Sequence, residues 1–167
     1  MIGLTNSENG KVSSIAATKR LARAMMVSGG EFSLLLVCCN CVQRQQQVLN
    51  LLTEFSSADI HEILLSPTDE KLYTAITNEI GTTQPEALMV SGLESVVAIN
   101  QLIISTNIMR DEFRKQFQFP LVLWVNDEIL RKLVWLAPDF KDWAASTIRF
   151  DIPNNQLIES EQQAISA

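Results

Sequence analysis

Residues 32–39 read FSLLLVCC, and this stretch decides the fold class. A short, nearly continuous apolar run is typical of a strand buried on both faces of a parallel sheet, because neither face then meets water. Four later segments are compatible with further strands of the same sheet. They are residues 60–65 (IHEILL), 86–93 (EALMVSGL), 120–125 (PLVLWV) and 147–152 (TIRFDI).

Helical patterns separate these segments. Strands that alternate with helices are typical of a parallel sheet, whose neighbouring strands are joined by right-handed crossovers. We therefore predict an α/β three-layer sandwich: a mainly parallel five-stranded sheet with helices on both faces. The expected helices cover residues 14–28, 43–56, 67–81, 95–117 and 127–137.

Two of these helices carry capping signals at their start. Ser66 precedes Pro67, which suits a capping hydroxyl followed by proline in the first turn, and Asn126 precedes Asp127 in the same way. We expect a capped helix to begin at each site.

The composition bounds the domain organisation and the class of protein. A chain of 167 residues fits one domain, which we place at 14–153, between a flexible N-terminus (1–13) and a polar C-terminal tail (154–167). The net charge of −6 and pI near 4.8 argue against a nucleic-acid partner. No apolar run reaches bilayer length, and the first residues lack the apolar core of a secretory signal. We expect a cytoplasmic protein with no membrane partner.

Three cysteines lie close together, at Cys38, Cys39 and Cys41. A zinc site usually has four ligands, and the single histidine, His61, is remote in sequence. We interpret the cysteines as reduced, metal-free side chains. We interpret His61 as a surface or edge residue of its strand before a catalytic base.

Parallel sheets bind ligands outside the carboxyl ends of their strands, so these turns are where chemistry is expected. A phosphate-binding loop needs glycines, a lysine and a Ser or Thr after the first strand. The turn here reads CNCVQRQQQ, in which Arg44 is the sole cation. We therefore expect no catalytic residues, no metal and no cofactor. The tentative binding residues are Asn40, Gln43, Arg44, Ser91, Glu94, Asn126, Asp127 and Trp143.

Some of these residues have a second interpretation. Glu94 could act as a base or a metal ligand, but a carboxylate in the first turn of a helix is also favoured by the helix dipole. Asp127 and Glu128 suit a helix start better than a pair of catalytic acids. We expect Trp124, Trp135 and Trp143 to pack in or around the core, with Trp143 partly exposed as an anchor for a partner.

Residues 107–150, NIMRDEFRKQFQFPLVLWVNDEILRKLVWLAPDFKDWAASTIRF, resemble the terminal part of the NTPase-like domains of bacterial STAND signalling proteins. The resemblance implies a P-loop-NTPase-like fold that has lost its phosphate-binding loop. It also implies structural roles for Asn107, Arg110, Asp111, Pro138, Asp139 and Phe140. We expect Arg110 and Asp111 to form an internal ion pair.

Three functions remain open at this point. The first is a non-catalytic P-loop-like module that acts in signalling through a protein partner or self-association. The second is an atypical domain that binds or hydrolyses ATP or GTP. The third is an unrelated α/β binding or transferase domain that uses the same edge of the sheet.

Overall fold

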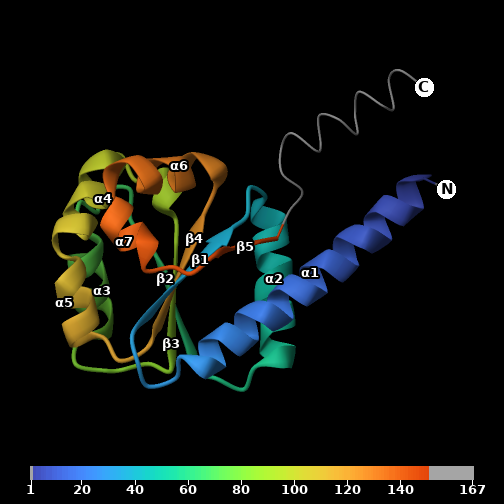
Figure 1. Cartoon of the computed structure of the whole chain (residues 1–167), viewed down its shortest axis with the longest axis horizontal. Helices are drawn as coiled ribbons and strands as arrows, with labels where there is room; N and C mark the ends of the chain where they lie inside the picture. The colour runs from blue at the N-terminus through green and yellow to red at the C-terminus, as the bar shows by residue number, and fades with distance from the viewer. Residues whose placement is uncertain (1, 151–167) are drawn as a thin grey trace.

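The computed structural model describes residues 2–150, with side chains from Ser14 onward. Its sheet has five strands, all parallel, in the order β2-β3-β4-β1-β5 (Figure 1). The α/β class and the parallel sheet predicted from the sequence are confirmed. The strands are β1 (Ser33–Cys38), β2 (Ile60–Leu64), β3 (Ala87–Ser91), β4 (Pro120–Val125) and β5 (Thr147–Arg149).

The helices form one layer on each face of the sheet (Figure 1). In the strand order, the connection from β1 to β2 runs toward the β2 edge of the sheet, whereas the connections from β2 to β3, β3 to β4 and β4 to β5 run toward the β5 edge. Because such connections are right-handed, the helices of the first lie on one face and those of the others on the opposite face. One face carries α1 (Ile2–Val27) and α2 (Val42–Phe55). The other carries α3 (Leu72–Ile80), α4 (Ile99–Ile108), α5 (Arg110–Gln116), α6 (Asp127–Leu136) and α7 (Pro138–Asp142).

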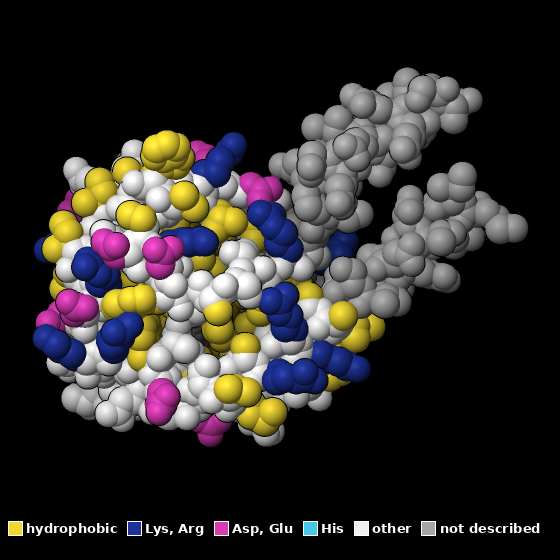
Figure 2. All heavy atoms as spheres, viewed as in Figure 1, with side chains coloured by type: hydrophobic (Ala, Val, Ile, Leu, Met, Phe, Trp, Pro, Cys, Tyr) yellow, Lys and Arg dark blue, Asp and Glu magenta, His cyan; other side chains and the backbone are white. Residues whose placement is uncertain are grey.

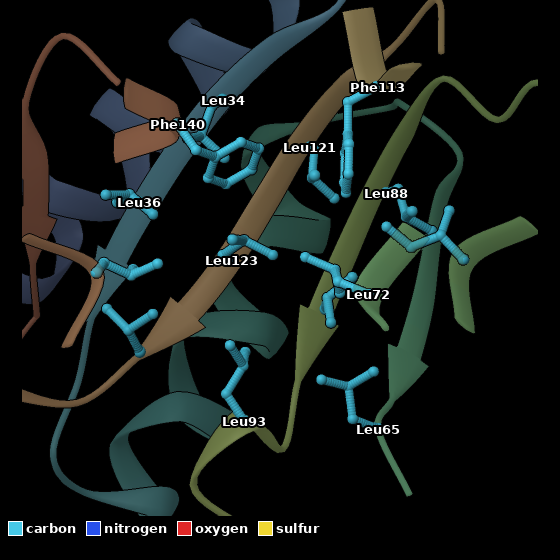
Figure 3. Close-up of a cluster of buried hydrophobic side chains, with 14 of the residues drawn as sticks. Leu34, Leu36, Leu65, Leu72, Leu88, Leu93, Phe113, Leu121, Leu123 and Phe140 are labelled. Carbon is cyan, nitrogen blue, oxygen red and sulfur yellow. The ribbon is translucent and has the colours of Figure 1, made fainter. Parts of the chain in front are cut away.

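Each helical layer encloses its own hydrophobic core, because side chains on a strand alternate between the two faces. Leu121 and Leu123 of β4 face the larger core, where Phe113 of α5 and Phe140 of α7 meet them (Figure 3). Val122 and Trp124 face the smaller core under α1 and α2. All six residues of β4 are buried, as the sequence predicted for a strand covered on both sides.

The first helix is longer than the sequence predicted. It starts at Ile2 and not at residue 14, so it extends into the segment for which we expected a flexible terminus. Its end is close to the predicted one, because Gly30 follows with a φ of 83°, a left-handed conformation that glycine adopts without steric cost. The predicted tail, 154–167, lies outside the described residues.

The helix predicted to follow the Ser66–Pro67 cap begins only at Leu72. The Asp69 carboxylate accepts a hydrogen bond from the backbone N–H of Ser66 (2.7 Å), which folds the segment into a turn. The carbonyl of Pro67 accepts a hydrogen bond from the backbone N–H of Val97 (2.9 Å). These contacts hold the segment against the chain that leaves β3, and they outweigh the local capping signal.

The long helix predicted over 95–117 was also wrong in its bounds. A single 3₁₀ turn, η1 (Leu93–Ser95), follows β3, and α4 begins at Ile99. The turn depends on Gly92, whose φ is 91° and where a Cβ would lie 3.2 Å from the backbone nitrogen and oxygen of Leu65. At Met109 a ψ of 10° separates α4 from α5.

Candidate functional site

The crevice between β1 and β4 is the position at which a fold of this type binds ligands. The helix after β1 lies on one face and the helix after β4 on the other, so the two chains diverge at the carboxyl edge. Only three residues, 39–41, separate β1 from α2. The backbone N–H of Cys39 donates to the carbonyl of Val125 (2.9 Å), which continues the pairing of the two strands into the turn.

Two hydrogen bonds join the two sides of this crevice. The side-chain amide of Asn40 donates to Oδ2 of Asp127 (2.9 Å), and its carbonyl oxygen accepts from the backbone N–H of Asp127 (2.9 Å). One asparagine side chain therefore satisfies both the carboxylate and an N–H at the start of α6. We call this pair of bonds the Asn40–Asp127 clasp.

Arg149 extends the clasp to the third strand of this edge. The Arg149 guanidinium donates a hydrogen bond to Oδ1 of Asp127 (2.8 Å), and the two side chains form an ion pair. The same guanidinium lies 3.5 Å from Sγ of Cys38. The Cys38 thiol lies 3.4 Å from the same carboxylate oxygen. The register of β1 against β5 places Cys38 opposite Arg149, which explains why these side chains meet.

These contacts set the ionisation of Asp127. The hydrogen bond from Arg149 is the largest effect and lowers the pKa of the carboxyl below its ordinary value of 3.8. Partial burial opposes this effect by disfavouring the charged form, and the hydrogen bonds from Asn40 and Cys38 lower the pKa further. Asp127 is therefore a carboxylate at neutral pH.

The start of α6 was predicted correctly from its capping residues. The side chain of Asn126 accepts a hydrogen bond from the backbone N–H of Ile129 (2.8 Å), so Asn126 is the N-cap. Asp127 and Glu128 lie in the first turn, where negative charge is favoured.

Several of the other predicted binding residues also lie at this edge. Glu94 and Asn126 line a small cavity of about 70 Å³ beside Asn40. Gln43 is exposed in the first turn of α2, and Ser91 is half-buried at the end of β3. The edge is thus a polar surface with little concave volume.

Arg44 lies in the first turn of α2 but its side chain turns away from the crevice, and Trp143 lies at the opposite end of the sheet. The Arg44 guanidinium turns toward α1 and donates to Oγ of Ser14 (2.8 Å) and to the carbonyl of Phe150 (3.3 Å). Trp143 follows α7 and packs its ring against Phe32, which precedes β1 at the opposite end of the sheet. Arg44 thus ties α2 to α1, and Trp143 does not belong to the carboxyl edge.

Of the three tryptophans, Trp135 does not pack where the sequence predicted. Trp124 is buried and Trp143 is half-buried beneath the guanidinium of Arg114, 4.2 Å from its ring centroid. Trp135 of α6 was expected to pack in or around the core, but 82% of it is exposed. It lies two positions from the buried Leu133, so the helix turns it to the opposite side.

The remaining candidates for chemistry are dispersed. His61 is on the edge strand β2, as expected, and its Nε2 lies 3.7 Å from a carboxylate oxygen of Glu79. Cys38 is buried, Cys39 half-buried and Cys41 exposed, and all three are free thiols. Within the part of the chain that the structure describes, no three His, Cys, Asp or Glu residues form a group that could hold a metal ion.

Most residues of the segment that suggested a family do come together. Asn107, near the end of α4, accepts through Oδ1 a hydrogen bond from the backbone N–H of Phe140 in α7 (3.0 Å). Arg110 donates to the carbonyl of Asn107 (2.7 Å) and lies 3.9 Å from the carboxylate of Asp139. The predicted pair of Arg110 with Asp111 is wrong, because Asp111 is exposed and Arg110 faces α7.

Comparison with known proteins supports the fold alone. No protein-family model and no characterised protein sequence matches the chain. Among solved structures it is similar to the ORC2 protein of Aeropyrum pernix, described as ADPNP–ADP complexes, with 8% identity and a TM-score of 0.51. The match covers 81% of this chain and 46% of that one, so this chain corresponds to less than half of that protein. The shared architecture is an α/β fold with a parallel sheet.

Replacing Asp127 by asparagine tests the clasp. The pKa of Asp127 is lower in the folded than in the unfolded chain, so its contribution is complete above the ordinary value of 3.8 and is lost as pH falls through the folded pKa. Because the pair is partly exposed, we expect Asp127→Asn to cost about 1 kcal/mol at neutral pH. The variant should also lose stability less steeply in acid. Urea unfolding across the acid range measures both effects, and Glu128→Gln, which removes the adjacent exposed carboxylate, is the matched control for the lost charge.

The contact between α4 and α7 gives a second test. Asn107→Ala leaves the N–H of Phe140 without its acceptor and should cost about 1 kcal/mol, as the loss of a helix cap does. Asp111→Ala should change the free energy of unfolding by less than about 0.5 kcal/mol, which is typical of an exposed site. Equal destabilisation by the two changes would contradict this assignment.

Proposed function

We propose that this chain is a non-catalytic module with a P-loop-like fold that acts in cytoplasmic signalling through protein contacts. The observation that carries the proposal is the Asn40–Asp127 clasp across the crevice in which this fold type binds ligands. The polar groups at the centre of the crevice thereby bond to one another, while Gln43 and Glu94 beside it stay exposed.

The turn after β1 argues against a phosphate-binding role. The P-loop pattern spans about eight residues, whose glycines let backbone N–H groups converge on phosphate. Three residues, 39–41, stand in that place, and Cys39 already donates its N–H to β4. The Asp127 carboxylate at the same edge would repel a phosphate, and the charge of Arg149 is balanced by that carboxylate.

The same edge offers polar groups to a protein surface. Gln43 and Glu94 are exposed on either side of the crevice, and Asn40 is exposed between β1 and α2. Polar and charged groups of this kind give an interface its specificity and orientation. We infer that this edge contacts a protein partner or a second copy of the chain.

The relation to bacterial STAND proteins is part of the same proposal. It is supported by the contacts of Asn107, Arg110, Asp139 and Phe140, since the residues that suggested the family form one packed junction. Pro138 begins α7 at this junction, where its missing N–H costs nothing. In that setting the module would contribute to assembly rather than to hydrolysis.

No helix within residues 2–150 has the length and apolarity of a bilayer span.

Thermal unfolding with nucleotide tests the non-catalytic assignment against the alternative of an atypical ATP- or GTP-binding domain. A ligand at about a hundred times its Kd adds about 2.7 kcal/mol, which for a domain of this size raises Tm by roughly 5–10 °C. We expect no rise with millimolar MgATP or MgGTP beyond that given by matched salt. A rise of several degrees that disappears in Arg149→Ala would support the nucleotide-binding alternative.

Charge changes at the edge test the protein-contact role. Gln43→Arg and Glu94→Arg alter exposed side chains and should weaken association at least several-fold while changing stability by less than about 0.5 kcal/mol. Gln101→Arg on α4, also exposed, is the matched control. Sizing and pull-down experiments on folded variants provide the measurement. Unchanged association of both edge variants would place the contact surface elsewhere.

A further inference from the structure

A groove of about 590 Å³ lies at the end of the molecule opposite the Asn40–Asp127 clasp. The second half of α1 forms one wall, the end of α2 forms the other, and both elements lead into the amino ends of strands. Ala22 and Met25 are largely buried and give the groove an apolar floor, and Phe55 contributes an aromatic ring at its wall. Its volume is within the range of established ligand sites.

Two cations border this apolar floor. Nζ of Lys19 lies 5.3 Å from the ring centroid of Phe55, a cation–π contact that holds the ammonium over the groove. Arg23 lies one helical turn further along α1 and lines the same groove. Among the residues that the structure describes, no carboxylate lies within ion-pair distance of either cation. Glu86 also lines the groove, but its Oε2 accepts a hydrogen bond from the backbone N–H of Asp59 (2.9 Å).

The end of α1 also exposes apolar side chains at the groove. Met26 is 77% exposed and Val27 79% exposed, although both follow the buried Met25. Figure 2 shows lysine and arginine side chains beside hydrophobic ones over this part of α1. The groove is lined by two cations, Lys19 and Arg23, and one carboxylate, Glu86, so its local charge is positive in a chain of net charge −6.

We propose that this groove binds an acidic amphipathic segment of a protein partner. The apolar side chains of the segment pack on Ala22, Met25 and Met26, and its carboxylates pair with Lys19 and Arg23. An amphipathic peptide is favoured because the exposed apolar side chains of Met26 and Val27 stand beside the two cations, so the ligand must present both apolar groups and carboxylates. The exposed charges of Lys19 and Arg23 are the specificity element of this docking site.

The test uses fluorescence anisotropy with a synthetic labelled peptide. The probe is an amphipathic helix with leucine at every third and fourth position and glutamate elsewhere. One control peptide carries lysine in place of glutamate, and another carries serine in place of leucine. The protein variants are Lys19→Glu/Arg23→Glu for the cations and Met26→Asp for the exposed apolar side chains. Lys71→Glu/Arg131→Glu changes the same charge at exposed positions of the opposite helical layer.

The acidic peptide should bind the wild type and the Lys71/Arg131 control equally. Binding should weaken about tenfold or more in Lys19→Glu/Arg23→Glu and in Met26→Asp, and it should weaken as salt is raised. Equal binding of the lysine or serine peptide, or no saturable binding of the acidic peptide, would overturn the proposal. Self-association of the wild type that is lost in Lys19→Glu/Arg23→Glu would also overturn it, because the occupant would then be a second copy. Each variant is first checked for folding by thermal unfolding. The edge variants Gln43→Arg and Glu94→Arg should bind the peptide as the wild type does. Failure of the groove proposal is therefore distinguishable from failure of the proposed function at the carboxyl edge.

Discussion

The carboxylate of Asp127 holds together the ends of three parallel strands. It receives hydrogen bonds from Asn40 after β1 and Arg149 in β5, while its own backbone begins the helix after β4. Parallel strands bring all their carboxyl ends to one edge, so polar groups of the turns must be satisfied there. The Asp127 side chain, at the centre of this edge, accepts hydrogen bonds from two of these groups, Asn40 and Arg149. The positions of the turn after β1 and of α6 therefore depend on this side chain.

The anion at the centre of this edge is supplied by the chain itself. In a phosphate-binding domain, a lysine and the N–H groups at a helix start are balanced by the bound phosphate. Here the positive charge is Arg149, which pairs with Asp127, and the helix start is that of α6, whose N–H groups at Asp127 and Ile129 donate to Asn40 and Asn126. The partly exposed ion pair between Arg149 and Asp127 contributes modest stability. It also means that the positive charge of Arg149 is already neutralised by a carboxylate of the same chain. The parallel α/β architecture that the chain shares with the Aeropyrum pernix ORC2 protein therefore says little about the chemistry of this edge.

The strands and the start of α6 could be predicted because their signals are local. PLVLWV at 120–125 is apolar on both faces, and Asn126 caps the next turn through its own side chain. Arg149 could not be predicted as part of the edge, since only the order of the sheet shows that β5 pairs with β1. The break before α4 was hidden for a related reason: the Val97–Pro67 hydrogen bond joins segments that are distant in sequence. Trp135 was expected near the core from its apolar character, but it lies two positions from the buried Leu133 and therefore faces the opposite side of α6.

A titration of isotope-labelled protein with MgATP, followed by the backbone amide resonances, tests most directly whether the Asn40–Asp127 clasp has closed the ligand position. The reference is a titration with magnesium chloride and sodium chloride at the same ionic strength. We expect the amides of residues 39–44 and 126–129 to show no saturable shift beyond that reference. Saturable shifts confined to these two segments would show that phosphate enters the crevice, and would contradict the account.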